Sequence, residues 1–322
     1  MKSIVYMKYG PPEVLLRKEV EKPTPANHEV LVRVIATSVT TADCMMRRGD
    51  TALSRIFLGF RKPRKKYQIP GTEFSGVVES VGQKVSKFKP GDEVYGFRGF
   101  GTGCYASYKC IHENGSLALK PRNMDFREAA SIVDGASTAL FFLKEKAGIR
   151  NGQKVLINGA SGSIGTFAVQ LASYFGAEVT GVCGTRNMEL VKLLGAEKVV
   201  DYTKYDFTET VNTYDIIFDT VGKSNFIHCR KALKPGGKYM VTVMTFRHVL
   251  LSLLTRIGKG KKVIFSMSVD KTDSLNSIRT MVEAGNLVTI IDKEYSLEEI
   301  QEAHTYVEKG HKTGSVVITV NN

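Results

Sequence analysis

The sequence predicts an α/β fold, with a doubly wound parallel sheet and a second, mainly β domain. Three observations support this prediction. About the first 120 residues contain short apolar strand patterns, such as Glu29–Ile35 and Ser75–Val81, between glycine and proline turns. From Gly152 onward, strand patterns alternate with helix patterns. A glycine-rich loop lies directly after the first of these later strands.

The first long helices are expected after the N-terminal strands. Asp125 and Glu128 have the spacing of a capping box, which predicts a helix that begins near Asp125. A second helical run is expected over about residues 138–147, and it should end before Gly148. Both helices precede the region in which strands and helices alternate.

Six strands are expected after Gly152. Because parallel strands joined by helices take right-handed crossovers, this alternation predicts a doubly wound sheet. The helix after the first of these strands places its apolar residues on one face. The expected strands span residues 155–158, 178–183, 198–201, 214–219, 238–243 and 262–267.

The segment after Gly285 is expected to return to the first domain, because it does not extend the six-stranded sheet in an obvious way. It contains one more strand pattern and a helix whose start is marked by Ser296 and Glu299 and whose end is marked by Gly310. A final strand is expected over residues 315–320.

The segment Lys154–Gly165 carries the pattern most specific for a function. An apolar strand leads into Gly159-x-x-Gly162-x-x-Gly165, and an amphipathic helix follows. Glycines in this order permit a tight turn, close approach of the backbone to a pyrophosphate, and close packing of the helix on the strand. The helix N-terminus offers N–H groups and a partial positive charge to the phosphates. The pattern therefore predicts a dinucleotide site.

The residues after the second strand favour NADP(H) over NAD(H). A carboxylate about 20 residues past the glycines selects NAD, whereas a basic residue there suits the 2′-phosphate of NADP. The segment Val182–Asn187 has no acid and contains Arg186, whose guanidinium can hold a phosphate through two hydrogen bonds. Asn187 is expected to cap the next helix, whose N–H groups add further donors.

Composition indicates a folded protein in a reducing compartment. Of 322 residues, 43% are hydrophobic and 24% are charged. No apolar run reaches the ~18 residues that a membrane span needs, and the N-terminus lacks the apolar core of a signal peptide. The five cysteines include no Cys-x-x-Cys pair, so a cytoplasmic protein without a disulfide framework is expected.

The chain is basic, with 45 Lys and Arg against 32 Asp and Glu and a formal net charge of +13. Two clusters concentrate the charge, at residues 61–66 and 256–262. A solvated surface that suits an anionic cofactor is the favoured interpretation; contact with nucleic acid or with an acidic membrane surface is the less favoured one. The apolar segment Phe246–Ile257 is expected to pack beside the cofactor domain or in a dimer interface.

Further motifs follow one another in a fixed order along the chain. They are Pro70–Gly76, Pro90–Tyr95, the glycine loop, Leu194–Glu197 with Val200–Tyr202, Tyr214–Asp215 with Asp219, and Leu233–Gly237. Together they resemble the medium-chain dehydrogenase/reductase superfamily, in its zinc-free quinone oxidoreductase (zeta-crystallin-like) branch, over nearly the full length. The resemblance implies a mainly β, GroES-like catalytic domain built from both chain ends, residues 1–122 and 286–322. This domain would enclose a Rossmann NADP(H)-binding domain, residues 123–285, through which a homodimer would form.

Zinc ligands are missing where the zinc-dependent relatives have them, so no metal is expected. Thr72 stands where their Gly-His-Glu motif supplies a histidine, Cys104 and Cys110 alone cannot build a four-cysteine site, and Cys44 lacks partners. Without a Lewis acid, an alcohol dehydrogenase is the least favoured activity. Hydride transfer to an already activated acceptor remains feasible.

The resemblance also implies roles for individual residues. Asp43 fits the aspartate of the family's Asn-Pro-x-Asp segment beside the substrate pocket, although Thr40 and Thr41 replace the asparagine and proline. Met45 stands in that pocket where relatives often have tyrosine or lysine. Lys312 resembles a C-terminal position that approaches the cofactor. The other cofactor-binding residues would be Thr138, Gly159, Ser161, Gly162, Ser163, Ile164, Gly165, Gly184, Thr185, Arg186, Asn187, Tyr202, Val221, Val243, Phe265, Ser266 and Met267.

The sequence thus predicts an NADPH-dependent reductase of quinones or activated α,β-unsaturated carbonyls that transfers hydride directly. The proton donor stays open, because solvent and Asp43 acting through water both fit the pattern. A purely capping role for Asp43, which would leave solvent as the donor, fits it equally well. An enoyl-thioester reductase with a basic rim at residues 61–66 is one alternative. An NADPH-sensing protein that binds RNA or a membrane surface, with little turnover, is the other.

Overall fold

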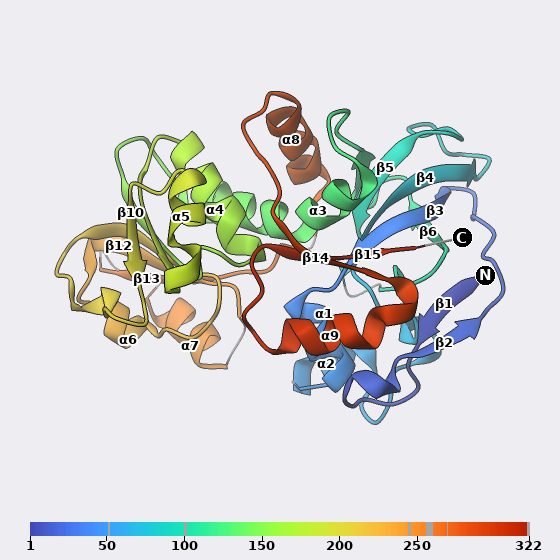
Figure 1. Ribbon diagram of the computed structural model, residues 1–322, viewed down its shortest axis with the longest axis horizontal. Helices are drawn as coiled ribbons and strands as arrows, with labels where there is room; N and C mark the ends of the chain where they lie inside the picture. The colour runs from blue at the N-terminus through green and yellow to red at the C-terminus, as the bar shows by residue number, and fades with distance from the viewer. Residues whose placement is uncertain (51, 100–101, 244–245, 256–259, 269, 321–322) are drawn as a thin grey trace. The chain divides into compact units, whose positions relative to one another are not determined.

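The computed structural model describes residues 1–50, 52–99, 102–243, 246–255, 260–268 and 270–320, which form two compact units (Figure 1). The first unit comprises Met1–Asp134, Val269–Ala284 and Thr289–Asn322, so it contains both chain ends. The second unit comprises Gly135–Ser268 and Gly285–Val288. These limits differ from the predicted domain boundaries, because α8 (Thr272–Glu283) packs on β7 (Leu117–Leu119) of the first unit. No helix among the described residues is long and apolar enough to cross a membrane.

The second unit contains a six-stranded sheet in which every neighbouring pair of strands is parallel. This confirms the predicted doubly wound architecture. In spatial order the strands are β10 (Lys198–Asp201), β9 (Glu178–Cys183), β8 (Lys154–Asn158), β11 (Tyr214–Asp219), β12 (Leu233–Val241) and β13 (Lys262–Phe265).

Three of these strands have other limits than the sequence predicted, and β8 differs only by beginning one residue early, at Lys154. β12 begins at Leu233, five residues before the predicted start, because a bulge opposite Tyr214 lets the Pro235-Gly236-Gly237 segment stay in the sheet. It ends at Val241, and β13 ends at Phe265, two residues early in each case. A proline and two glycines are typical of a turn, which is why the sequence pattern misplaced the start.

The helices of the second unit lie on both faces of its sheet. α4 (Ser163–Tyr174) and α5 (Met188–Leu193) cover one face, and α6 (Phe226–Cys229) and α7 (Phe246–Leu254) cover the other (Figure 1). The strand order reverses between β8 and β11, and that reversal sends the crossovers to opposite faces. The carboxyl ends of β8 and β11 therefore lie side by side at a topological switch point, where α/β sheets bind ligands.

A single long helical stretch precedes this sheet. α3 (Phe126–Leu140) continues directly into a π-helical stretch, Phe141–Ala147, so the predicted boundary near residue 138 is wrong. Ser137 and Thr138 resemble the start of a helix in sequence, but they lie inside one. The start is as predicted, since the Asp125 N–H donates to Glu128 Oε2 (2.8 Å) and the Glu128 N–H donates to Asp125 Oδ1 (2.9 Å).

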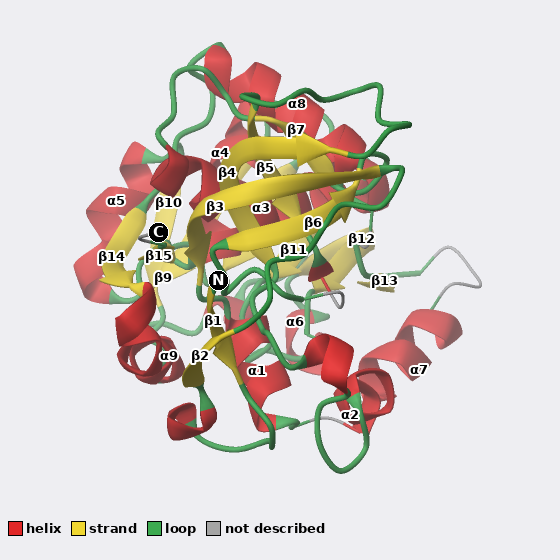
Figure 2. Ribbon diagram, turned by 90° about the vertical axis from the view of Figure 1, so that its right-hand side faces the viewer, coloured by secondary structure: helices red, strands yellow, loops and turns green. Residues whose placement is uncertain are grey.

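The first unit is built on a seven-stranded sheet, and β1 (Lys2–Val5) and β2 (Leu16–Glu19) form a separate antiparallel pair. The C-terminal strands lie beside N-terminal β3, red next to blue in Figure 1, which confirms that the chain returns to its first domain. Figure 2 shows β3, β4, β5 and β7 side by side. In spatial order the sheet contains β14 (Ile291–Ser296), β15 (Ser315–Thr319), β3 (Glu29–Ser38), β4 (Glu73–Val81), β5 (Glu93–Phe97) and β7, with β6 (Tyr108–His112) also paired to β3.

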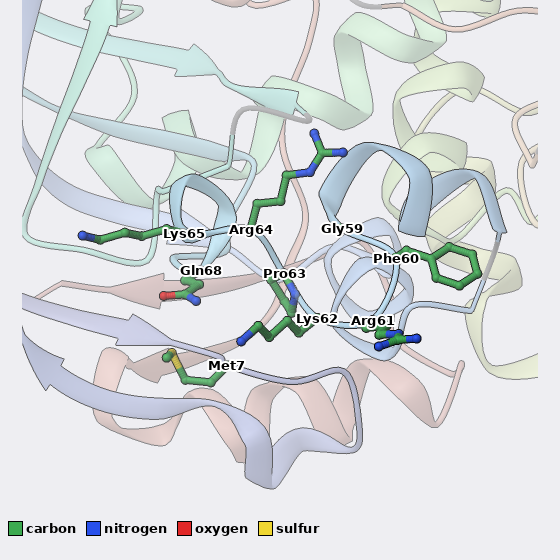
Figure 3. Close-up of a pocket in the computed structure, with 9 residues that line it drawn as sticks. All are labelled: Met7, Gly59, Phe60, Arg61, Lys62, Pro63, Arg64, Lys65 and Gln68. Carbon is green, nitrogen blue, oxygen red and sulfur yellow. The ribbon is translucent and has the colours of Figure 1, made fainter.

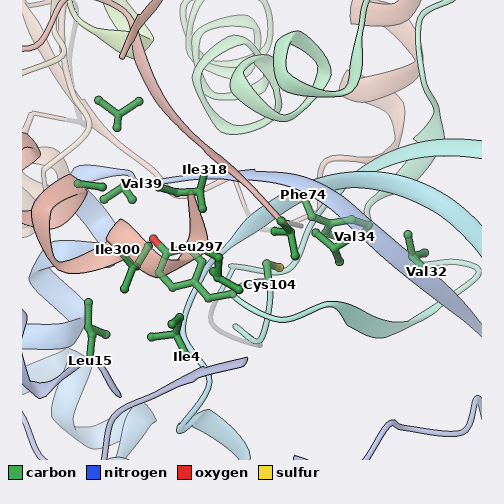
Figure 4. Close-up of a cluster of buried hydrophobic side chains, with 14 of the residues drawn as sticks. Ile4, Leu15, Val32, Val34, Val39, Phe74, Cys104, Leu297, Ile300 and Ile318 are labelled. Atoms are coloured by element: carbon green, nitrogen blue, oxygen red, sulfur yellow. The ribbon is translucent and has the colours of Figure 1, made fainter. Parts of the chain in front are cut away.

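The first half of α3 packs on this sheet through Phe126 and Ala130, and besides α3 and α8 three helices of the described residues accompany it. They are α1 (Thr41–Arg48), α2 (Ala52–Leu58) and α9 (Ile300–Glu308), and short 3₁₀ turns lie at Pro12–Val14, Lys65–Tyr67 and Leu297–Glu299. The core contains side chains from both chain ends, with Ile4 and Leu15 near Leu297, Ile300 and Ile318 (Figure 4). Burial of these apolar surfaces holds α1 and its polar residues against the sheet.

Candidate functional site

Each of the three glycines in the loop after β8 has a different structural role. Gly159 has φ +80°, and a Cβ there would lie 2.1 Å from Val221 Cγ2. A Cβ on Gly165 would lie 2.0 Å from the Gly159 carbonyl oxygen, so α4 packs directly on the loop. A Cβ on Gly162 would meet only the Gly159 oxygen, at 3.4 Å. The space in front of Gly162 is therefore open to a ligand.

The N-terminus of α4 starts at this open position. Gly162 is the N-cap and has no side chain, so the cap residue does not occupy the first-turn N–H groups. Ser163 and Ile164 begin the helix and are half-buried. The N–H groups and the helix dipole favour an anion there.

The carboxyl ends of the strands form one row at the edge of the sheet. Sheet register pairs Asn158 with Val182 on one side and with Asp219 on the other, and it continues through Val241 to Phe265. The loops that follow these strands therefore share one edge. Ser266 and Met267 continue directly from that edge, and Met267 is 40% exposed.

Asp219, at the end of β11, holds the adjacent loop in place. Its fully buried carboxylate accepts hydrogen bonds from Asn158 Nδ2 and from the N–H groups of Val221 and Gly222, all at 2.9–3.1 Å. Further bonds come from Ser224 and Tyr239. The loop is thereby fixed with Val221 against Gly159, and a Cβ on Gly222 would lie 2.6 Å from Val243. The sequence placed Asp219 only in a motif; its position at the end of a buried strand was the available signal.

The segment after β9 presents no carboxylate at the strand end. The nearby Asp201 is buried and accepts hydrogen bonds from Thr185 Oγ1 (2.5 Å) and from Thr203 N–H and Oγ1 (3.0 and 2.7 Å). These bonds, first that of Thr185, lower the pKa of Asp201. Its carboxylate therefore has its hydrogen-bond partners within the protein and is buried away from the surface.

Arg186 and Tyr202 are exposed in this region. Arg186 lies in the 3₁₀ turn Thr185–Asn187, and the Tyr202 ring lies 3.7–3.9 Å from where a Cβ on Gly184 would be. Asn187 does not cap α5 with its side chain, contrary to the prediction. Its Nδ2 instead donates to Ser161 Oγ (3.1 Å), because the 3₁₀ turn directs the amide back to the glycine loop.

Asp43 belongs to the first unit, where it is the third residue of α1 and forms a capping box with the N-cap residue Thr40. Its Oδ2 accepts hydrogen bonds from Thr40 N–H (2.9 Å), Thr40 Oγ1 (2.6 Å) and Thr72 Oγ1 (3.4 Å). Its Oδ1 is buried and has no hydrogen-bond partner among the described residues. Burial raises the pKa of Asp43 to about 6. Met45 lies half-buried one half-turn further along the same helix.

Glu73 is a second buried carboxyl group, which the sequence assigned only to a motif. It accepts hydrogen bonds from Ser38 Oγ and from the Asp134 N–H (2.6 Å). Burial, and then the charge of Asp134, raise the pKa of Glu73 to about 8. The Asp134 carboxylate itself pairs with Lys271 Nζ (2.5 Å). An acid inside an otherwise apolar strand pattern was the signal for this group.

Lys312 lies in the same unit, just before β15. Its ammonium donates to the Gly314 carbonyl (2.6 Å). Burial lowers the pKa of Lys312 to about 8, although the charge of Glu73 acts to raise it. The predicted residues thus fall into two sets. Asp43, Thr40, Met45 and Lys312 belong to the first unit, and all other predicted cofactor residues, including half-buried Thr138, belong to the second.

Cys44, the residue after Asp43 on α1, forms a buried pair with His304 of α9. Sγ lies 3.3 Å from Nδ1, and burial lowers the pKa of His304 to about 3 and raises that of Cys44. Both groups are therefore neutral near pH 7. Among the described residues, no three His, Cys, Asp or Glu side chains are arranged to hold a metal ion.

Comparisons with known proteins agree over nearly the whole chain. Residues 26–122 match the family model of the alcohol dehydrogenase GroES-like domain, and residues 194–318 match that of the zinc-binding dehydrogenase. A chloroplastic quinone-oxidoreductase of Triphysaria versicolor is 32% identical, over 99% of this chain and 98% of its own. A chloroplastic NADPH-dependent alkenal/one oxidoreductase of Arabidopsis thaliana is 30% identical, over 99% and 79%. The solved quinone oxidoreductase of Coxiella burnetii superposes with a TM-score of 0.89 at 27% identity, covering 100% of this chain and 99% of its own.

Proposed function

The chain belongs to the medium-chain dehydrogenase/reductase superfamily, in its quinone oxidoreductase branch, and we propose that it reduces quinones or activated α,β-unsaturated carbonyls with NADPH, without zinc. The observation that carries the proposal is the glycine loop at the switch point of the second unit, followed by a strand end without an available carboxylate. The names of the relatives support the same reaction class.

The residues of the second unit fit NADPH. The N-terminus of α4 and the open side of Gly162 would bind the pyrophosphate, and Arg186 would bind the 2′-phosphate beside Thr185 and Tyr202. The loop held by Asp219, with Val221 and Val243, would bind the nicotinamide half together with Thr138 and the segment Phe265–Met267. When bound, NADPH supplies a hydride from its nicotinamide ring.

Asp43 is the proposed proton donor. A quinone or enone that has accepted a hydride needs a proton on oxygen or carbon, and a carboxyl group with a pKa of about 6 can give and regain one near neutrality. We assign the proton to Oδ1, because Oδ2 already accepts the hydrogen bonds from Thr40 and Thr72 while Oδ1 is unpartnered among the described residues. Thr40 and Thr72 would position the carboxyl group, and Met45 would add an apolar pocket wall.

The proposal of a zinc-free reaction rests on the donor set of the first unit. The Thr72 side chain has no nitrogen to offer a metal, and Cys44 is a single buried cysteine. His304 Nδ1 already contacts the Cys44 thiol. In the part of the chain that the structure describes, this unit offers no group of three His, Cys, Asp or Glu side chains that could hold a catalytic zinc ion.

A cytoplasmic homodimer is proposed as the state in which the protein works. All five cysteines are unpaired, as expected for a reducing compartment. β13 is an edge strand of the second unit, and α7 beside it exposes Leu253 and Leu254. An open strand edge with exposed apolar side chains favours pairing with a second copy.

Steady-state oxidation of NADPH and of NADH against a small acceptor panel tests the function. The panel contains a benzoquinone, an ortho-quinone, an enone and an enoyl-coenzyme A, each with and without prior treatment of the enzyme with a chelator. We expect turnover of a quinone or the enone with NADPH, unchanged by the chelator. Turnover of the thioester alone would favour the enoyl reductase, and stoichiometric zinc with chelator-sensitive alcohol oxidation would contradict the proposal.

A further inference from the structure

A segment of the first unit concentrates positive charge without any compensating acid. Between Asp50 and Glu73 the chain contains six Lys and Arg and no Asp or Glu. We call residues 55–66 the basic segment; it includes the end of α2, the loop after it and the start of the 3₁₀ turn Lys65–Tyr67. Neither the cofactor residues nor the proposed proton donor belongs to it.

The loop of the basic segment has a defined structure. Gly59 has φ +137°, and a Cβ there would collide with the Lys62 carbonyl, so the turn requires glycine. The Arg64 N–H donates to the Leu58 carbonyl (2.7 Å), and the Tyr9 hydroxyl donates to the Gly59 carbonyl (2.5 Å). The turn encloses an open hollow of about 510 Å³, whose walls include Met7, Phe60, Arg61, Lys62, Arg64 and Lys65 (Figure 3).

The five cations at residues 61, 62, 64, 65 and 66 are all exposed. None of them forms an ion pair with a carboxylate in the part of the chain that the structure describes. Two of them contact uncharged groups, since Arg64 donates to the Ile56 carbonyl (3.4 Å) and Lys66 lies 4.7 Å from the Tyr67 ring. The positive potential of the basic segment is therefore available to an anionic partner.

Apolar side chains are exposed beside these cations. Phe60 is 73% exposed and Ile56 is 60% exposed, and Phe57 and Met7 are also exposed. Leu58, in contrast, is fully buried and anchors α2. Large apolar groups next to Lys and Arg are typical of segments that lie at a membrane interface, with rings at the acyl boundary and cations among the phosphates.

We propose that the basic segment docks the protein on the surface of an anionic phospholipid bilayer. Phe57 and Phe60 enter the interfacial layer, and the cations at residues 61–66 contact the headgroup phosphates. The proposal goes beyond the reductase function and does not depend on it.

Two other occupants explain the observations less well. A nucleic acid would use the cations and could stack bases on Phe57 and Phe60, but it would leave the exposed aliphatic side chains of Ile56 and Met7 without an apolar partner. A second copy of the chain, related by two-fold symmetry, would place the same cations opposite one another, which is repulsive. An anionic lipid surface satisfies both the cations and the aliphatic groups.

Co-sedimentation of the full chain with vesicles tests the proposal. We expect binding to vesicles of phosphatidylglycerol and phosphatidylcholine, little binding to phosphatidylcholine alone, and a steep loss of binding as salt rises. The double variant Lys62→Gln/Lys65→Gln should weaken binding about 30-fold, since each cation near such a surface contributes roughly a fivefold factor. Phe60→Ser should weaken it about tenfold or more, because an apolar ring leaves the interface.

Matched variants separate the basic segment from general charge and hydrophobicity. Lys84→Gln/Lys87→Gln removes the same charge from another exposed site of the first unit, and Leu193→Ser removes another exposed apolar side chain. Both should bind vesicles like the parent, and all variants should keep the parent melting temperature. Equal binding to neutral vesicles, or equal effects of both lysine pairs, would overturn the proposal. So would capture of a single-stranded RNA oligomer without vesicle binding, or a dimer that Phe60→Ser converts to monomer.

Discussion

Arg186 is the side chain on which the proposed choice of NADPH over NADH depends. Replacing it with alanine removes a charge-assisted contact to the 2′-phosphate, so KM for NADPH should rise about 10- to 100-fold while KM for NADH stays unchanged. Steady-state kinetics with both cofactors measure this. Lys192→Ala, which removes an exposed cation from α5, is the control and should leave both constants as they are. Equal losses with both cofactors in Arg186→Ala would contradict the assignment.

Asp43 is expected to govern the pH dependence of turnover. The acid form donates the proton, so kcat should fall as pH rises through about 6. Asp43→Asn keeps an oxygen for the hydrogen bonds from Thr40 but has no acid. We expect its kcat to be roughly 10²-fold lower and independent of pH in this range, with KM for NADPH unchanged. A variant with the parent kcat and pH profile would leave Asp43 only a capping role.

Glu73 is expected to make stability depend on pH. Its folded-state pKa of about 8 lies above the ordinary value of 4.5, so the folded state binds the proton more tightly than the unfolded state. Relative to Glu73→Gln, the parent should therefore lose stability as pH rises from about 4.5 to about 8, by roughly 1 kcal/mol per pH unit, and no further above pH 8.

Urea unfolding at pH 5, 6.5 and 8 measures this difference. Glutamine can accept from the Asp134 N–H and donate to Ser38 Oγ, so the variant keeps both contacts. Glu302→Gln, at an exposed position of α9, should track the parent at every pH. A constant difference between parent and Glu73→Gln would show that Glu73 is ionised across the range.

Single residues were predictable from the sequence where a local motif determines them. The glycine loop and the Asp125 cap are of this kind, because neighbours within a few residues define their geometry. Glu73 and His304 were not, since their burial comes from segments far away in the chain. Their partners Asp134 and Cys44 lie 61 and 260 residues away.

The junction of β8 and α4 allows two neighbouring glycines to be separated experimentally. Gly165→Ala forces a Cβ against the Gly159 carbonyl and should destabilise the fold by about 1–3 kcal/mol. Gly162→Ala meets no comparable contact and has an extended backbone, so it should leave stability unchanged but weaken NADPH binding by filling the open side of the loop. Thermal unfolding and NADPH fluorescence titration distinguish the two. Loss of stability in both variants would contradict the separate roles.

Helices and strands were predictable where the spacing of the apolar residues and the length of the apolar run indicate the same kind of element. The strands at 178–183, 198–201 and 214–219 were predicted at their observed limits, because these apolar runs are too short for a helix and have turns on both sides. α3 was split wrongly, since Ser137 and Thr138 are helix-start residues by type but are enclosed by tertiary packing here. The early start of β12 depends on a bulge, which no periodicity indicates.

At the scale of the molecule, a dimer through the second unit predicts that α7 contributes to the interface. Light scattering after size-exclusion chromatography should give a dimer for the parent and a monomer for Leu253→Ser/Leu254→Ser. Leu193→Ser, at an exposed position of α5, is the control and should remain dimeric. A monomeric parent would contradict the proposal.

The fold class was predictable, because alternation of strands and helices and the glycine loop define a doubly wound sheet. The limits of the two units were less predictable than the fold class. α8 follows the last strand of the second unit in the chain, yet it packs with the first unit, where the Tyr95 hydroxyl donates to the Leu275 carbonyl (2.6 Å). A helix pattern indicates which face is apolar but not which sheet covers that face.

The position of β15 between β14 and β3 affects how the protein is made. A ribosome releases residues 36–38 of β3 long before it synthesises their partners, residues 317–319 of β15. All strands of the second unit emerge in between, so that unit can fold during translation. β6 pairs with residues 29–33 of β3 early, but residues 36–38 must wait with an unpaired edge until β15 arrives. Completion of the first sheet is therefore the late step of biosynthesis, and the nascent chain is most exposed to aggregation or to chaperone capture during that interval.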